Sequence, residues 1–209
     1  MLLAFDTATP HVTVAVHDGT SVLASFQSQE SMRHGEMLVP AIERVLAGAG
    51  VRPADLTAIA VGVGPGPFTG LRVGLVTART LRLVCDVPVH GVCSLDILAA
   101  EAIDAGLAEF AVATDARRKE VYLAAYADGR RVSGPAVVHP ADAATTVPVV
   151  GRGAVLYPES FPHALGPEHP SAAVLCDIVL RRRFELLAPD PLYLRRPDAA
   201  EPGKPKRVS

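Results

Sequence analysis

The residues best suited to chemistry follow two apolar segments in the first third of the chain. Asp6 and Thr7 come directly after residues 2–5, and the run GPGPFTG at residues 64–70 comes after a second apolar segment. A carboxylate and a hydroxyl in that place can orient a metal-bound water or a nucleotide phosphate. A glycine-rich turn ahead of a helix presents backbone N–H groups that hold phosphate. These features predict an anion or nucleotide site made of Asp6, Thr7, Gly66, Thr69 and Gly70.

The same segments also fit a purely structural turn. Pro65 and Pro67 lack the N–H groups that a phosphate-binding loop uses, and no Lys follows them as one does in a P-loop. An Asp at the end of a strand commonly caps a tight turn. We therefore favour a rigid turn over an anion site at residues 64–70.

The histidines do not indicate a metal site. Two histidines four residues apart on a helix can hold a cation, but His34 has Leu38 at that spacing, which predicts a capping or surface role for His34. His163 and His169 lie in a proline-rich stretch, and we interpret them as surface residues. No Ser, His and Asp set or Cys and His set has a spacing that indicates nucleophilic catalysis. The sequence thus predicts no catalytic residue, no metal site and no cofactor.

An internal repeat is the most informative pattern in the chain. Residues 109–129 repeat the order of residues 1–19: an apolar strand, an Asp, a polar turn, a second apolar strand and an Asp-Gly turn. Asp115 lies 109 positions after Asp6, and the same offset aligns Val12 with Val121, Val14 with Leu123 and Val16 with Ala125. A repeat of this length predicts two related lobes, although strand, Asp and strand is also a common hairpin pattern.

The second copy of the repeat carries its own polar turn, DARRKEVY. Its Arg117, Arg118 and Glu120 can bind an anion or a partner, and an exposed, salt-bridged turn is the alternative. The tail is the other basic segment, with Lys204, Lys206 and Arg207, and most such tails are solvated.

Length and composition limit the organisation and the partners. The 209 residues, 49% hydrophobic and 20% charged, can form one large domain or two lobes of about 100 residues. We predict an N-terminal lobe over residues 1–107, a smaller C-terminal lobe over 108–195 and a disordered tail over 196–209. A net charge of −2 gives no general attraction to phosphate backbones, which disfavours tight nucleic-acid binding by the chain alone.

The compartment follows from two further patterns. The N-terminus, MLLAFDTATP, lacks a secretion-signal pattern, and no apolar run approaches the roughly 20 residues that span a bilayer. Cys85, Cys93 and Cys176 form neither a CxxC pair nor a regular framework, which predicts reduced, buried thiols. We expect a cytoplasmic protein that does not contact a membrane.

The helix predicted over residues 69–84 is apolar on more than one side. Leu71, Leu75, Ala78 and Leu81 form one side, and four further apolar residues lie elsewhere around it: Val73, Val76, Leu83 and Val84. A surface helix needs one apolar stripe, so either the lobe encloses this helix or its second face contacts another subunit. With the preceding helix it can form a four-helix bundle with a partner. The predicted partner contacts are Met37, Leu38, Ala41, Leu71, Arg72, Leu75, Ala78 and Arg79.

Four segments together resemble the TsaB (YeaZ) family of tRNA-modification proteins. They are FDTATPHVTVAV, RHGEMLVPAIERVL, VGVGPGPFTGLRVGL and DARRKEVY, and PLYLRRP at residues 191–197 resembles the family's closing motif. The resemblance is strong over residues 1–127, and residues 128–190 carry little recognisable pattern. It implies an α/β, two-lobed, actin-like or Hsp70-like (ASKHA) fold, in which each lobe is a ribonuclease-H-like mixed sheet with helices. Pro67 stands where the family commonly has Ser, which further weakens a phosphate contact.

The resemblance implies a partner role and no chemistry of the chain's own. TsaB-like proteins pair with the catalytic paralogue TsaD and, with the ATPase TsaE, support threonylcarbamoyl transfer from its adenylate to the tRNA adenosine beside the anticodon. The two N-lobe helices build that contact, ATP or ADP belongs to the complex, and tRNA is reached through it. TsaD-like proteins bind metal through a helical pair of histidines. Leu38 at the second of these places implies a pseudoenzyme, able to form a heterodimer or a homodimer.

Two other classes of function are alternatives to this partner role. One is an actin-like ATPase or a glycoprotease-type metallopeptidase that acts alone, which the missing histidine pair and the proline-interrupted loop argue against. The other is a structural homodimer that uses the same apolar helix face.

Overall fold

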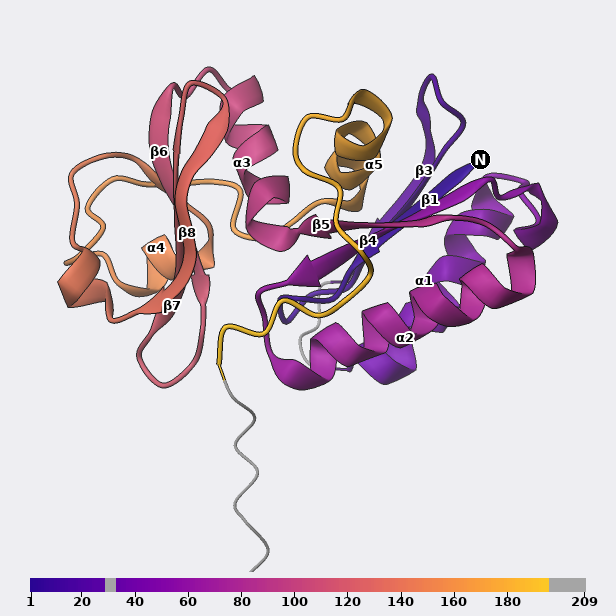
Figure 1. Cartoon of the computed structure of the whole chain (residues 1–209), viewed down its shortest axis with the longest axis horizontal. Coiled ribbons are helices and arrows are strands. Elements are labelled where there is room, and N and C mark those ends of the chain that lie inside the picture. Colours follow the sequence, from indigo (N-terminus) through magenta and orange to yellow (C-terminus); the bar gives the residue numbers. More distant parts are fainter. Residues whose placement is uncertain (29–32, 196–209) are drawn as a thin grey trace, which may run out of the picture.

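Two five-stranded mixed sheets organise the chain (Figure 1). The computed structural model describes residues 1–28 and 33–195. The first sheet has the order β3-β2-β1-β4-β5 and contains β1 (Leu2–Asp6), β2 (Thr13–His17), β3 (Val22–Gln27), β4 (Ala58–Gly64) and β5 (Val89–Cys93). The second has the order β10-β9-β6-β7-β8 and contains β6 (Glu109–Asp115), β7 (Val121–Ala127), β8 (Arg130–Val138), β9 (Val149–Val150) and β10 (Ala164–Leu165).

Both sheets have the same topology. The first strand of each sheet pairs antiparallel with the second and parallel with the fourth, since β1 pairs in this way with β2 and β4, and β6 with β7 and β9. When the strands of each sheet are numbered by their order in the chain, both sheets read third, second, first, fourth, fifth from one edge to the other. The predicted two-lobed α/β fold with a mixed sheet in each lobe is therefore confirmed. The predicted tail, residues 196–209, lies outside the described residues.

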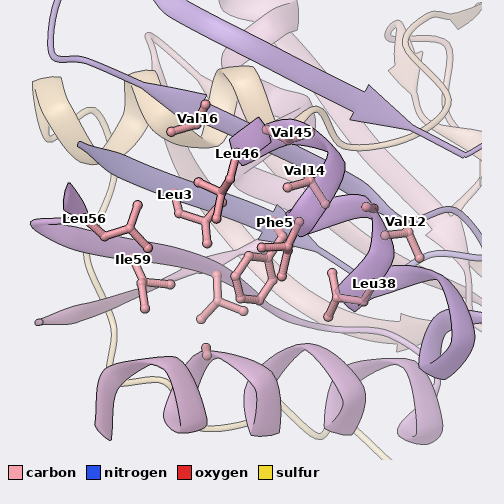
Figure 2. Close-up of a cluster of buried hydrophobic side chains, with 14 of the residues drawn as sticks. Leu3, Phe5, Val12, Val14, Val16, Leu38, Val45, Leu46, Leu56 and Ile59 are labelled. Atoms are coloured by element: carbon pink, nitrogen blue, oxygen red, sulfur yellow. The ribbon is translucent and has the colours of Figure 1, made fainter. Parts of the chain in front are cut away.

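Helices α1 (His34–Gly48) and α2 (Phe68–Cys85) cover one face of the first sheet. In α1 the buried residues Leu38, Ile42 and Val45 recur every three or four positions, which is the spacing of one helical face. Figure 2 shows this cluster, in which Phe5 and its strand neighbours point from the sheet toward the helices. The helix predicted over residues 69–84 is confirmed, one residue longer at each end.

The second face of each sheet is covered by a helix that belongs to the other half of the chain. Helix α3 (Ser94–Asp104) follows the first sheet, yet Leu95, Leu98 and Ala99 pack against Phe110 and Val112 of the second. Helix α5 (Ala172–Arg181) follows the second sheet and packs on the first. Figure 1 shows α3 between the lobes and α5 on the side of the first sheet opposite α1 and α2. The segment predicted as the second lobe thus contributes its last helix to the first.

Polar contacts fix α3 at its first turn. Ser94 Oγ donates a hydrogen bond to Asp6 Oδ2 at 2.5 Å, and Tyr126 Oη donates one to Asp96 Oδ1 at 2.7 Å. Burial raises the pKa of Asp96, opposed by the bond from Tyr126 and by Arg131 nearby. A serine at residue 94 favours an N-cap, but Ser94 is the first helical residue and its hydroxyl binds the sheet instead.

The alignment of the repeat needs a correction of one residue. Thr13 lies opposite Asp6, whereas Val121 lies opposite Asp115, so no single offset fits both strands of the hairpin. Val14 packs with α2, and Leu123 packs with the cluster of α4 (Arg152–Leu156), the helix after the fourth strand of its sheet. The offset of 109 therefore holds for the second strand, and the residue equivalent to Asp6 is Thr114, one position before Asp115.

After α5 the chain continues as a C-terminal strap, residues 184–195. Leu187 and Gly91 exchange two backbone hydrogen bonds of 2.8 Å, which covers the outer edge of β5. Leu192 N–H donates to the carbonyl of Val63 at 2.9 Å. Arg195 then reaches the second lobe, where Nη1 donates to the carbonyl of Ala116 at 3.2 Å. The strap therefore ties both lobes together.

The thiols lie largely inside the fold. Cys93 and Cys176 are buried and Cys85 is half-buried, and all three are free cysteines. Burial raises the pKa of Cys93 and of Cys176 to about 12, so both thiols stay protonated at neutral pH. No helix within the described ranges has the length and apolar character needed to cross a membrane.

The exchanged helix α3 leads to a prediction about pH. Glu101 is half-buried there, and burial, together with the charge of Asp104, raises its pKa to about 7. Because the pKa is raised, protonated Glu101 stabilises the folded state fully at pH values below 4.5. This stabilisation is lost as the pH rises through about 7. Glu101→Gln should therefore gain stability relative to the parent chain between pH 4.5 and 8, measured as urea midpoints. An equal difference at every pH would contradict the assignment.

Candidate functional site

An open cleft of about 760 Å³ lies where the two lobes meet. The first lobe contributes the turn between β1 and β2, including Thr9 and His11, and the second contributes Thr114, Arg152 and His169. A volume of this size falls in the range of small-molecule sites. The cleft is thus a concave place in which residues of both lobes come together.

The charged groups of the cleft are largely paired with each other. Arg152 Nη1 donates to Glu168 Oε2 at 2.6 Å, and Arg117 Nη1 lies 3.2 Å from Asp115 Oδ2. Each guanidinium is therefore matched by a carboxylate. A cleft with this arrangement does not concentrate charge of one sign, which is how protein clefts attract small ions.

Two histidines meet at the wall of the cleft. The rings of His11 and His169 have centroids 4.1 Å apart, and Nδ1 of His11 lies 2.7 Å from the carbonyl oxygen of Ser28. Burial, together with the neighbouring His11, lowers the pKa of His169 to about 4, so its ring is neutral at physiological pH. His163 is exposed as predicted. His169 is half-buried at the cleft, and its Nδ1 is buried without a hydrogen-bond partner among the described residues.

Asp6 is enclosed in the first lobe. It is 1% exposed, its Oδ1 accepts a hydrogen bond from Ala8 N–H at 2.7 Å, and its Oδ2 accepts from Ser94. Burial raises the pKa of Asp6, and the two hydrogen bonds oppose that rise. Because both oxygens are used inside the protein, Asp6 does not present a carboxylate to the cleft.

The GPGPFTG loop packs directly against the turn after β1. A Cβ added at Gly66 would lie 2.2 Å from the carbonyl oxygen of Ala8, and one at Gly70 would lie 2.4 Å from that of Thr7. Thr7 Oγ1 donates to the carbonyl of Gly70 at 2.8 Å. The glycines thus allow two backbone segments to approach each other, which supports the structural interpretation of the loop.

The five residues of the predicted anion site therefore do not form one. Asp6, Thr7, Gly66 and Gly70 are buried where the loop meets β1, whereas Thr69 is exposed. None of these five lines the cleft between the lobes. The sequence pattern correctly placed the loop beside the turn after β1, but backbone contacts fill the space between them.

Most of the predicted partner contacts are core residues. Five of the eight are buried, with exposed fractions of 0% to 4%: Leu38, Ala41, Leu71, Leu75 and Ala78. They pack between the first sheet and its two helices, and Met37 packs partly buried against the same cluster. The assignment of these five to a partner surface is wrong, because a helix side with regular apolar spacing faces the core of its own lobe first.

The two predicted arginines are exposed but hold the C-terminal strap. Arg79 forms an ion pair with Asp190 and donates to the carbonyl of Pro189 at 2.9 Å. Arg72 lies over the ring of Phe68 at 3.7 Å from its centroid, and the Phe68 ring stacks on Tyr193 of the strap. The side of α2 that carries these arginines is therefore partly occupied by the chain itself.

The exposed apolar residues of α2 are not among the eight predicted partner contacts. Leu83 is 83% exposed, Val84 76% and Val76 59%. They recur at seven and eight positions. Val76 and Leu83 each lie four positions after Arg72 and Arg79, so the exposed side of α2 carries apolar residues and arginines together. On helix α1, Val39 is 50% exposed. Their spacing was visible in the sequence, but periodicity alone did not tell which of two apolar sides faces solvent.

The position four residues after His34, where a metal-binding helix would carry a second histidine, belongs to the core. His34 begins α1, and its Nε2 lies 2.7 Å from the carbonyl oxygen of Thr9. Leu38, four residues on, is 0% exposed. Across residues 1–28 and 33–195, no group of three His, Cys, Asp or Glu residues is placed to hold a metal ion. His34 thus connects α1 to the turn after β1.

Comparisons with known proteins agree with this architecture. The family model described as TsaD, tRNA N6-adenosine threonylcarbamoyltransferase, matches residues 23–156. The structure of YeaZ from Pseudomonas aeruginosa superposes with a TM-score of 0.77 at 31% identity, covering 92% of this chain and 99% of that one.

Two relatives show how far the sequence similarity extends. An uncharacterized protein of Mycobacterium tuberculosis is 43% identical over 203 residues, covering 95% of this chain and 93% of the relative. The Escherichia coli tRNA threonylcarbamoyladenosine biosynthesis protein TsaB is 36% identical over 126 residues, covering 60% of this chain and 54% of that protein. The similarity to the named relative therefore covers part of each chain, whereas the structural similarity is nearly complete.

The close packing around Asp6 can be tested at Gly62. A Cβ on Gly62 would lie 1.7 Å from Asp6 Oδ2 and 2.9 Å from Ser94 Oγ, so Gly62→Ala should displace that hydrogen bond. We expect the free energy of unfolding to fall by about 3 kcal/mol in urea denaturation. Gly48→Ala is the control, since its new methyl group would meet Ala24 Cβ at 3.9 Å. Equal stability of the two variants would show that the contact around Asp6 is unimportant.

Proposed function

This chain belongs to the TsaB (YeaZ) family, and we propose that it is a non-catalytic subunit in the biosynthesis of threonylcarbamoyladenosine in tRNA. In this proposal it binds and supports a catalytic TsaD-type paralogue in the cytoplasm, together with a TsaE-type ATPase. The complex transfers threonylcarbamoyl to the adenosine beside the anticodon. The chain itself supplies a binding surface rather than reacting groups.

The observation that carries the proposal is the exposed apolar face of α2. Exposed side chains of Val76, Leu83 and Val84 occupy one side of a helix whose other side is already buried. Exposed large apolar residues on one helix side favour a protein contact, because water contact with them is unfavourable. A second helical pair could pack on α1 and α2 to form a four-helix bundle.

The surroundings of Asp6, of the loop after β4 and of Leu38 support a non-catalytic role. The carboxylate of Asp6 is consumed by hydrogen bonds within the lobe, and the loop that follows β4 is closed by the turn after β1. Leu38 contributes to the core at the place where a metal-binding pair would need its second histidine. A protein can keep the fold of an enzyme family while its sites lose the chemistry.

The same surface also fits self-association. An isologous pair buries the same patch on both chains, so a single apolar helix face suffices. A homodimer would then compete with the heterodimer for α2. This second possibility can be followed by sizing at several concentrations.

A single substitution on the exposed face tests the partner role. Leu83→Asp places a charge where we propose an apolar contact, and since Leu83 is 83% exposed, the chain should still fold. We expect association with the TsaD-type paralogue of the same organism, measured by co-purification and titration, to weaken at least about tenfold. Val132→Asp on β8 is the matched control, because Val132 is 62% exposed and lies on the other lobe.

The outcomes separate the alternatives. Retained binding by Leu83→Asp would exclude this face, and absence of binding by the parent chain would exclude the partner role. If Leu83→Asp loses self-association but still binds the paralogue, this face serves the homodimer. Leu75→Asp cannot serve here, because Leu75 is 3% exposed and a charge there would disrupt the core.

A further inference from the structure

The turn between β6 and β7 has an unusual backbone. Arg117, Arg118 and Lys119 have φ angles of 61°, 54° and 61°, so three consecutive residues with side chains adopt the left-handed conformation. Ala116 N–H donates to the carbonyl of Glu120 at 3.0 Å, which closes the turn. Left-handed geometry costs roughly 1–2 kcal/mol per residue for L-amino acids and normally occurs at single positions. Gly or Asn would adopt it more easily.

The residues that bear this cost are all cationic and exposed. In a left-handed turn successive side chains point about 100° apart, so three consecutive cations fan out around one tip. The side chain of Lys119 makes no hydrogen bond or ion pair with the described residues. A strained turn that carries three long charged side chains is typical of a functional position, since stability alone would favour other residues there.

The surroundings add to the positive charge. Arg195 of the strap binds the carbonyl of Ala116 and forms an ion pair with Glu120. Asp115 pairs with Arg117 at 3.2 Å. This basic turn, defined as residues 115–120 with Arg195, holds four cations and two carboxylates, a net charge of +2 on a chain of net −2. Its charge therefore differs in sign from that of the whole protein.

We propose that the basic turn binds phosphate groups of an RNA strand. Arg and Lys side chains on a solvent-exposed tip suit phosphate oxygens, and such contacts position a nucleic acid without reading its sequence. The class of ligand rests on the proposed function, since the named relative is a tRNA-modification protein. The turn lies at one end of the second lobe, beside the last described residues of the strap and away from the middle and C-terminal turns of α2 (Figure 1). RNA and the paralogue can then bind the chain at the same time.

The test is the affinity for an unmodified tRNA transcript with adenosine beside its anticodon, followed by fluorescence anisotropy from 50 to 200 mM salt. The chain is measured alone and with the TsaD-type paralogue. The double variant Arg118→Gly/Lys119→Gly should bind about tenfold more weakly at the lowest salt, with a log–log salt slope shallower by about 1.4 to 1.8. Its thermal midpoint is measured alongside to show that the variant is folded, which we expect because glycine adopts a positive φ without strain.

Two controls separate phosphate binding from other effects. Arg182→Gly removes a cation that is also exposed and left-handed, with φ 53°, at the end of α5, and should bind like the parent chain. The exchange Arg118→Lys/Lys119→Arg keeps both charges and should retain binding.

Several results would overturn the proposal. They are no RNA binding by the parent chain under either condition, equal losses in the double-glycine variant and Arg182→Gly, or an unchanged salt slope in the double-glycine variant. Loss of paralogue binding with intact RNA binding would make the turn a protein contact instead. Failure of the proposed function appears separately, as absence of paralogue binding by the parent chain, and leaves the RNA titration of the chain alone readable.

Discussion

The exchange of α3 and α5 between the lobes is the constraint on which the rest of the structure depends. A mixed sheet with two apolar faces needs cover on both, and each sheet here obtains its second cover from a helix that follows the other sheet. Leu98 of α3 and Leu175 of α5 are both 0% exposed, so separating the lobes would bring both clusters into water. The lobes are thus joined by hydrophobic burial, and the strap adds hydrogen bonds along the edge of β5.

This constraint also determines what Asp6 and the loop after β4 can do. To seat α3, its first residue Ser94 binds Asp6, and Gly62 leaves the space that this contact needs. The loop after β4 is then held against the turn after β1 by the bond from Thr7 to Gly70. The polar groups expected to face a ligand are used to hold elements together. Besides the open cleft between the lobes, an apolar helix side on one lobe and a basic turn on the other stay accessible to solvent.

Much of the fold follows from local patterns in the chain. The hairpins, the strand before GPGPFTG and the helices at residues 34–48 and 68–85 have clear apolar periodicity, and the repeat indicated two related lobes. The one-residue error in aligning Asp115 with Asp6 arose because a strand alternates its side chains, so a single shift changes the face of every residue without changing the composition. Residues 128–190 had little periodicity, and their short strands β9 and β10 depend on pairing with β6 and with each other.

The sequence by itself determined the hairpins, the helices at residues 34–48 and 68–85, the duplication and the family, because these depend on residue type and spacing along the chain. Only the tertiary structure decided which apolar side of α2 is core, since Leu75 and Leu83 are equally hydrophobic and differ only in what lies against them. The same holds for Asp6, whose carboxylate can orient a ligand in one environment and tie a helix to a sheet in another. Burial and hydrogen-bond partners come from residues distant in sequence, and those contacts exist only once the lobes have packed.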